Sequence, residues 1–241
     1  MTQDKGEVFS RGMVVVAHAD DAEYGCSGTV AKWCSEGWEV IYVLCTDGSK
    51  GSDNREMTQE KLRRIRRREQ ANAGKVLGLK DVAFLEHEDG MLEPSLDLRR
   101  DIAREIRRHR PDVVICQLPS RVLEGESRGG HPDHMAAGEA TLGAVFPSAR
   151  DHLTFPELLE AGFEPHKVAE IWIMTHPKAD HWVDVTDHMD TSVKALLEHQ
   201  SQMGDRSDQE IGKRMREWRR NTAEGKGMKF AEAFKRICYS R

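Results

Sequence analysis

Short runs of apolar, mostly β-branched residues recur along the chain, separated by longer polar segments. The first run is MVVVA at residues 13–17, and the second is EVIYVLC at residues 39–45. Runs of this length that are apolar at nearly every position are typical of strands buried on both faces of a parallel sheet. The pattern predicts six strands, at residues 13–17, 39–45, 82–85, 113–116, 168–174 and 182–185.

Between these runs, apolar residues return with the spacing of a helix. Leu98, Ile102 and Ile106 fall four residues apart, and Pro111 follows where such a helix would end. Spaced apolar residues in the charged segment from residue 209 onward predict one or two helices, packed on the core or on another subunit. The remaining predicted elements are helices at residues 27–36, 58–77, 96–110, 131–145 and 192–199, and a glycine-rich loop at 117–130.

The alternation of strands and helices decides the fold class. It predicts an α/β protein in which a mostly parallel central sheet carries helices on both faces. The length of 241 residues suits a single domain of this kind.

Composition narrows the class of protein. Charged residues make up 32% and hydrophobic residues 38% of the chain, as in a water-soluble globular protein. The longest early apolar run is far too short to cross a bilayer, and no secretion signal is evident. Five cysteines without C-x-x-C spacing indicate reduced thiols rather than disulfides. We therefore expect a cytoplasmic protein that does not bind a membrane.

The net charge of −5 gives no general sign of nucleic-acid binding, but one segment is strongly basic. Residues 61–68 hold six lysine and arginine side chains and no aromatic residue. We interpret this segment as the solvated face of a helix, and keep a nucleic-acid or interaction module as the non-enzyme alternative.

The densest groups of polar, metal-capable residues follow the first and fourth predicted strands. Ligands of open parallel sheets bind beyond the carboxyl ends of the strands. His18 and Asp21 can reach one ion together from a tight turn, and His134 is the natural third ligand of a catalytic zinc. Asp20 is then placed to act as general base, and His131 as general acid or oxyanion stabiliser.

A simpler interpretation is that these residues are structural. In it, Asp20 and Asp21 only cap the following helix, and His131 is only the N-cap of another. It explains one acidic residue but not the whole set.

At these residues the sequence resembles the LmbE-like (PIG-L) family of zinc-dependent N-deacetylases. The family's A-H-P-D-D-x-E signature corresponds to residues 17–23, and its H-P-D-H signature to residues 131–134. The resemblance implies a Rossmann-like three-layer fold. It also implies hydrolysis of N-acyl groups on amino sugars such as N-acetylglucosaminyl inositols and malates, chitobiose and antibiotic sugars. It covers about residues 13–203, which would leave a C-terminal helical extension at about 204–241 of one domain spanning 1–241.

Carried over by position, the resemblance assigns roles to individual residues. His18, Asp21 and His134 would bind one Zn²⁺ per chain, Asp20 would be the general base, and His131 would stabilise the tetrahedral intermediate. Arg66 would contact the substrate, and Asp89 would bind a sugar hydroxyl. Residues 45–48 and 199–202 also look familial. Ala19 departs from the pattern, because the family has a proline there that would fix the turn.

The expected function is therefore zinc-dependent removal of an N-acetyl or other N-acyl group from an amino-sugar-type small molecule. The alternatives inside enzymology are an amidase of thiol conjugates and a deacylase of longer chains. A nucleotide-binding Rossmann protein would need a G-x-G-x-x-G turn after the first strand, where this chain has His-x-Asp-Asp. Iron or manganese could replace zinc in such a ligand set. A homo-oligomer is possible, and no nucleic-acid partner is expected.

Overall fold

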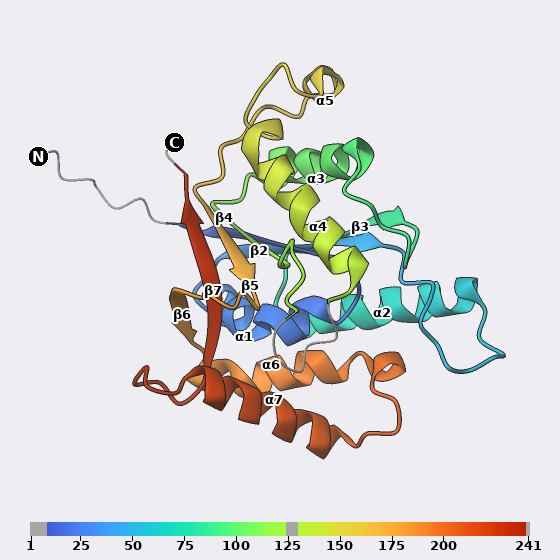
Figure 1. The fold of residues 1–241 in the computed structure, drawn as a ribbon, viewed down its shortest axis with the longest axis vertical. Coiled ribbons are helices and arrows are strands. Elements are labelled where there is room, and N and C mark those ends of the chain that lie inside the picture. The colour runs from blue at the N-terminus through green and yellow to red at the C-terminus, as the bar shows by residue number, and fades with distance from the viewer. Residues whose placement is uncertain (1–8, 124–129, 240–241) are drawn as a thin grey trace, which may run out of the picture.

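The computed structural model describes residues 9–123 and 130–239 and contains a seven-stranded sheet (Figure 1). Residues 124–129 of the glycine-rich loop predicted at 117–130 lie outside the described residues. The strand order is β3-β2-β1-β4-β5-β7-β6. The strands are β1 (Arg11–Val16), β2 (Glu39–Thr46), β3 (Asp81–His87), β4 (Val113–Cys116), β5 (Glu170–Met174), β6 (His181–Asp184) and β7 (Ala231–Cys238).

The first five strands are parallel, as the sequence pattern predicts. β1 pairs with β2 on one side and with β4 on the other, while β7 runs antiparallel between β5 and β6. The order therefore reverses between β1 and β4, which is the switch point where α/β sheets of this kind bind ligands.

Helices cover both faces of the sheet and complete three layers (Figure 1). α3 and α4 lie on one face, and α1, α2, α6 and α7 lie on the other. None of the helices in the described part of the chain is long and apolar enough to cross a membrane. The helices are α1 (Asp21–Ser35), α2 (Gln59–Leu77), α3 (Leu96–His109), α4 (Pro132–Gly143), α5 (Pro156–Glu160), α6 (Met189–Leu197) and α7 (Asp208–Thr222), with short turns η1 (Ala144–Ser148), η2 (Thr186–His188) and η3 (Gln200–Gln202).

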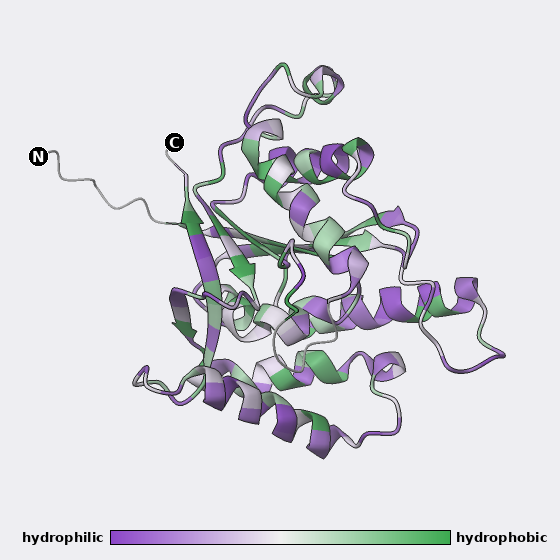
Figure 2. Ribbon diagram, viewed as in Figure 1, coloured by the Kyte–Doolittle hydropathy of each residue, from purple (hydrophilic) through white to green (hydrophobic). Residues whose placement is uncertain are grey.

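Alternation along β1 shows how the strands build two cores. Val14 and Val16 pack with α1 and α2 on one face, whereas Met13 and Val15 pack with α3 and α4 on the other. All four side chains are fully buried. Burial on both faces is why the run is apolar at every position. In Figure 2 the central strands of the sheet are coloured green, as hydrophobic residues.

Local signals in the sequence set several helix boundaries. The Thr58 hydroxyl accepts a hydrogen bond from the Lys61 amide at 3.2 Å and caps the start of α2. Gly78 ends the same helix with φ of 81°, a left-handed conformation that glycine adopts without strain. α1 begins at Asp21, six residues before the predicted start at Ser27, because its first turn carries polar functional residues rather than an apolar pattern.

The C-terminal segment differs from the prediction of a helical extension. It forms the helix α7, but residues 231–238 form the strand β7 instead of a second helix. The charged residues Glu232, Lys235 and Arg236 obscure the strand pattern in the sequence. The strand forms because β5 and β6 offer backbone partners on both of its sides, which is a long-range effect.

Candidate active site

The ends of β1 and β4 bring the two predicted motifs together. The strands are neighbours in the sheet, so the turn after β1 faces the loop that leads into α4. The imidazole ring of His18 lies 4.8 Å from that of His131 and 5.3 Å from that of His134, measured between ring centroids. Residues more than a hundred positions apart in sequence therefore share one site.

Three side chains present their ligand atoms to a common point. His18 Nδ1 lies 3.3 Å from His134 Nε2 and 3.3 Å from one oxygen of Asp21. The other oxygen of Asp21 lies 3.0 Å from His134 Nε2. Two ligand atoms that each lie about 2.1 Å from a tetrahedral zinc ion are about 3.4 Å apart. These three side chains, His18, Asp21 and His134, form a ligand triangle whose separations fit a divalent metal ion.

A second combination of residues at the same place is also capable of binding a metal. His18, His131 and His134 offer nitrogen atoms that all lie within 4.8 Å of one another. His18, Asp89 and Asp133 form a further group by the same measure. The site thus contains a histidine and carboxylate cluster that could hold a metal ion.

The carboxylates around His18 favour positive charge on its ring. Burial disfavours the charged imidazole, but hydrogen bonds to Asp133, Asp21 and Asp89 outweigh it and raise the pKa of His18 to about 12. Burial also raises the pKa of Asp21, but the hydrogen bonds from His134 and His18 reverse this and leave it well below its usual value. Positive charge at this point, from a proton or from a metal ion, is strongly favoured.

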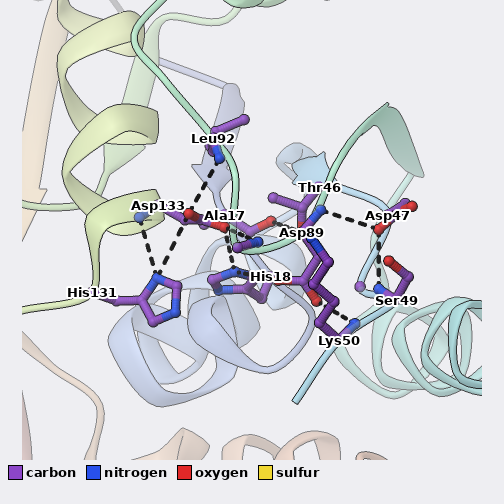
Figure 3. A network of polar contacts seen from close by, with 12 residues as sticks. Ala17, His18, Thr46, Asp47, Ser49, Lys50, Asp89, Leu92, His131 and Asp133 are labelled. Carbon is purple, nitrogen blue, oxygen red and sulfur yellow. Dashed lines mark hydrogen bonds and ion pairs between the residues drawn. The ribbon is translucent and has the colours of Figure 1, made fainter. Parts of the chain in front are cut away.

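Asp133 binds Nε2 of His18, the ring nitrogen that is not part of the ligand triangle, and Figure 3 draws the two side chains together. Its carboxylate is fully buried and lies 3.1 Å from His18 Nε2. It also accepts hydrogen bonds from the backbone amides of Gly90 at 2.7 Å and Leu92 at 3.3 Å. A carboxylate that binds the far nitrogen of a ligating histidine fixes the ring and leaves Nδ1 free for the metal. Sequence reasoning gave Asp133 no role, although it lies inside the second motif.

Asp20 occupies the position immediately before the first turn of α1. Its backbone has φ of 82°, an uncommon left-handed conformation for a residue other than glycine, and its side chain makes no capping hydrogen bond. The capping interpretation is therefore wrong for this carboxylate. Burial, followed by the charge of Asp21, raises the pKa of Asp20 from 3.8 to about 7. Ala19, where the resemblance expects proline, is buried, and the turn is closed by a 2.8 Å hydrogen bond from the His18 amide to Asp21.

His131 is both a helix cap and a residue of the site. Its Nδ1 accepts a hydrogen bond from the Asp133 amide at 3.2 Å (Figure 3), so the proton of the neutral ring is on Nε2. Burial and the neighbouring His18 and His134 lower the pKa of His131, which favours the neutral ring at pH 7. A neutral imidazole with a free Nε2–H is a hydrogen-bond donor suited to a developing oxyanion.

Arg66 and Asp89 are buried and contact each other. Arg66 Nη1 lies 3.2 Å from one Asp89 oxygen, which also accepts a hydrogen bond from the Lys50 amide at 2.9 Å. The other Asp89 oxygen lies 3.2 Å from His18 Nε2. The second guanidinium nitrogen of Arg66 donates to Gln202 at 2.8 Å. The two residues therefore connect η3 and α2 with His18.

The basic segment at residues 61–68 is partly engaged within the protein. Arg63 is paired with Asp47, Arg67 is paired with Glu86, and Arg66 is buried as described. Arg66 is the exception in this segment, because four of the six basic side chains, Lys61, Arg64, Arg67 and Arg68, are exposed as expected of a solvated helix face.

A buried pair behind the site was not foreseen from the sequence. His199 and Glu23 are both fully buried, and His199 Nε2 lies 3.2 Å from Glu23 Oε2. Gln70 donates to the other Glu23 oxygen at 3.1 Å. Both residues belong to segments that look familial in sequence, and that likeness was the only available signal, because nothing local indicates that they meet.

A cavity of about 280 Å³ opens beside the ligand triangle. Asp21, His131 and His134 lie in its wall, so the cavity adjoins the metal-capable cluster. The side chains that line the rest of it are mostly apolar, with Gln117, Ser120, Tyr24 and Thr175 as polar exceptions. A small organic substrate therefore has access to the site.

Close packing of α4 against the end of β4 fixes the second motif. A Cβ atom at Gly138 would lie 2.4 Å from the carbonyl oxygen of Gln117, which is too close for any side chain. The Gln117 side chain is buried and accepts a hydrogen bond from the Ala17 amide at 2.8 Å. These contacts fix the segments that carry His18 and His134 relative to each other.

The fold, the switch-point location and the cluster define an α/β protein with a metal-capable site in an open cleft, and comparison with known proteins identifies its family. The family model for GlcNAc-PI de-N-acetylase (PIG-L) matches residues 13–145. The chain belongs to this family.

The relatives include enzymes that act on acetylated sugars and on a thiol conjugate. The diacetylchitobiose deacetylase of Thermococcus kodakarensis is 30% identical over 190 residues, covering 79% of this chain and 69% of the relative. The mycothiol S-conjugate amidase of Streptomyces coelicolor is 30% identical over 182 residues, covering 66% of this chain and 59% of the relative. The solved structure of N,N'-diacetylchitobiose deacetylase from Pyrococcus horikoshii is 28% identical, with a TM-score of 0.87, covering 98% of this chain and 86% of that one.

Proposed function

We propose that this protein is a zinc-dependent hydrolase that removes an acetyl group from the nitrogen of an amino-sugar substrate. The observation that carries the proposal is the triangle of His18, Asp21 and His134 ligand atoms, with the separate carboxylate of Asp20 next in the chain. Relatives named as deacetylases of acetylated sugars support the substrate class.

Zinc is the metal that best fits the proposal. Two histidine nitrogens and one carboxylate are a ligand set of catalytic zinc sites, in which a further position is left for water or substrate. Iron and manganese accept the same donors. Analysis of the metal bound to the purified protein therefore tests whether it is zinc. When bound, the ion supplies Lewis acidity and lowers the pKa of water to about 7.

The residues of the chain account for the proton transfers. Asp20 accepts a proton from the attacking water while the oxygen of that water bonds to the acyl carbon of the amide. The Nε2–H of His131 donates a hydrogen bond to the carbonyl oxygen as it becomes negatively charged. When the carbon–nitrogen bond breaks, the proton held by Asp20 passes to the leaving nitrogen, and the amine and acetic acid are formed. The acid then gives its remaining proton to the amine or to solvent and leaves as acetate.

The substrate contacts of Arg66 and Asp89 stay predictions. Both side chains are buried and contact each other, and Asp89 also contacts His18. Replacing either residue would therefore also disturb the position of His18 in the ligand triangle. Their effect on substrate affinity therefore has to be measured together with metal content.

Two further properties belong to the proposal. We propose one metal ion per chain, and a cytoplasmic location supported by the five free cysteines. Assembly into a homo-oligomer and the lack of a nucleic-acid partner stay predictions.

The test of the proposed function is the Asp20→Asn variant. The wild-type protein, loaded with zinc, is expected to release acetate and free amine in equal amounts from N-acetylglucosamine or N,N'-diacetylchitobiose. Asp20→Asn should retain its zinc but lose about 10²–10⁴-fold in kcat, because the positioned base is gone. The exposed Asp187→Asn serves as the control and should behave as wild type.

Full activity in Asp20→Asn would remove this residue from the proposed role. Failure of the wild-type protein to hydrolyse any N-acylated sugar would contradict the proposed function itself.

A further inference from the structure

A second cavity adjoins the one beside the ligand triangle. It has a volume of about 270 Å³, and it shares Gly25, Thr175 and Trp218 with the first cavity as common wall. Ligand pockets commonly measure about 300–1,000 Å³, so either cavity alone is small and the two together fall within this range. The cleft therefore continues from the ligand triangle past Trp218.

Trp218 is an exposed aromatic residue in a fixed position. Its side chain comes from α7, is 40% exposed and lines both cavities. The next residue, Arg219, is buried, pairs with Glu232 at 3.0 Å and donates to the Tyr24 carbonyl of α1. The Arg219 guanidinium lies over the Trp218 ring, 4.3 Å from its centroid, so the buried arginine holds the indole in place. α7 and α1 lie on the same side of the sheet (Figure 1).

Thr175, which also lines both cavities, has a strained backbone. It follows β5 directly and has φ of 55°, a conformation that β-branched residues rarely adopt. Strain of this kind persists where the surrounding structure enforces it, and it is concentrated at functional sites. Thr175 is also exposed, so its hydroxyl is accessible to a ligand.

His176 adds a hydrogen-bond donor to the second cavity. Its Nδ1 accepts a hydrogen bond from the Lys178 amide at 3.0 Å, which places the proton of the neutral ring on Nε2. The charged residue of the cavity wall, Arg219, is paired with Glu232. The second cavity thus offers an aromatic face, hydroxyl groups from Thr175 and Thr222, and an imidazole N–H, but no unpaired charge.

We propose that the second cavity is a subsite for the neutral sugar ring attached to the N-acylated ring, with Trp218 as the specificity-determining residue between the two. This inference rests on the proposed function for the position of the N-acylated ring. The indole packs against the C–H face of the second ring, while Thr175 and His176 bind its hydroxyl groups. Trp218 belongs to α7, outside the residues 13–145 that the family model matches.

The test compares the binding of a disaccharide and a monosaccharide without turnover. Zinc-loaded Asp20→Asn protein is titrated with N,N'-diacetylchitobiose and with N-acetylglucosamine by calorimetry, alone and combined with Trp218→Ala, Trp218→Phe or His176→Ala. Trp218→Ala should weaken disaccharide binding by about tenfold through the loss of an aromatic contact. Its effect on the monosaccharide should be at least fivefold smaller. Trp218→Phe should recover most of the loss, and His176→Ala should weaken disaccharide binding by about threefold.

Leu153→Ala is the matched control, because Leu153 is also an exposed apolar residue but lies in neither cavity. It should leave both affinities unchanged. Equal losses on the two sugars, or no loss in Trp218→Ala, would overturn the subsite.

The same measurement separates the subsite from the proposed function. Selective loss of disaccharide binding in Trp218→Ala supports the subsite even where the wild-type protein proves inactive on both sugars. Turnover of both sugars with equal binding in Trp218→Ala rejects the subsite and leaves the deacetylase function standing.

Discussion

At the scale of the residue, His18 links protonation to metal binding. It lies between the ligand triangle on one side and the carboxylates of Asp133 and Asp89 on the other. These groups stabilise positive charge, so the ring holds a proton when no metal is bound. A metal ion at Nδ1 must displace that proton, and metal affinity therefore rises with pH.

The stability of the metal-free protein should fall as pH rises. The folded protein holds a proton on His18 up to a pKa of about 12, whereas the unfolded chain loses it near the ordinary value of 6.5. The stabilisation is fully present below pH 6.5 and is lost progressively above it. Between that pH and about 8.5, where unfolded cysteines begin to titrate, this group should lower the free energy of unfolding by at most about 1.4 kcal/mol per pH unit.

Urea unfolding in the presence of a chelator measures this slope. His18→Asn is the control, because it removes the titrating ring and keeps a polar side chain at the position. Identical slopes for the variant and the wild type would show that His18 is not the group that holds the proton.

At the scale of the element, β7 and α7 fasten the C-terminal segment to the helix that carries the site. The buried Glu232 of β7 pairs with Arg219 of α7 and accepts hydrogen bonds from the amides of Gly28 at 2.9 Å and Thr29 at 2.7 Å in α1. The Glu232 carboxylate therefore joins β7, α7 and α1. Because α1 begins at the ligand residue Asp21, these contacts also help to fix the position of the site.

Replacing Glu232 by alanine should destabilise the protein strongly. It would leave the buried Arg219 charge uncompensated and two amides without their acceptor, at a cost of about 3–5 kcal/mol in the free energy of unfolding. Chemical denaturation measures the effect. Asp190→Ala is the comparison, because this carboxylate pairs with Arg216 but is 87% exposed, and its loss should cost about 1 kcal/mol or less. Equal costs for the two variants would refute the structural role of Glu232.

At the scale of the whole molecule, the ligand triangle joins segments that are 116 residues apart in sequence. His18 and Asp21 lie between β1 and the first turn of α1, whereas His134 belongs to α4, which covers the face of the sheet opposite to α1. A metal ion held by all three connects these parts only in the folded state. Binding of the ion therefore stabilises the fold by mass action.

Zinc should raise the thermal unfolding temperature of the wild-type protein. At a free zinc concentration of about 1,000 times Kd, the gain is about 4.1 kcal/mol in the free energy of unfolding. His134→Ala should bind well below one zinc per chain and lose most of this gain. The measurements are calorimetry with and without zinc, and metal analysis of both proteins. An equal zinc response in His134→Ala would show that the ligand set is different.

Much of this molecule follows from local sequence. The apolar runs predict the strands, with β4 at its observed bounds, and the four-residue spacing of Leu98, Ile102 and Ile106 predicts α3. The strand β7 does not follow in the same way, because Glu232 interrupts its apolar pattern and its burial depends on Arg219 from another element.

The sequence by itself determined the parallel sheet, its helical layers and the two motifs, because burial on both faces and ligand chemistry are written in residue type and spacing. Only the tertiary structure decided that β1 and β4 are neighbours, and hence that His18 and His134 meet. It also decided which buried carboxylates, Asp133 and Glu23, support His18 and His199. The physical reason is that a buried polar group needs a partner, and that partner is supplied by the packing of distant segments rather than by its neighbours in the chain.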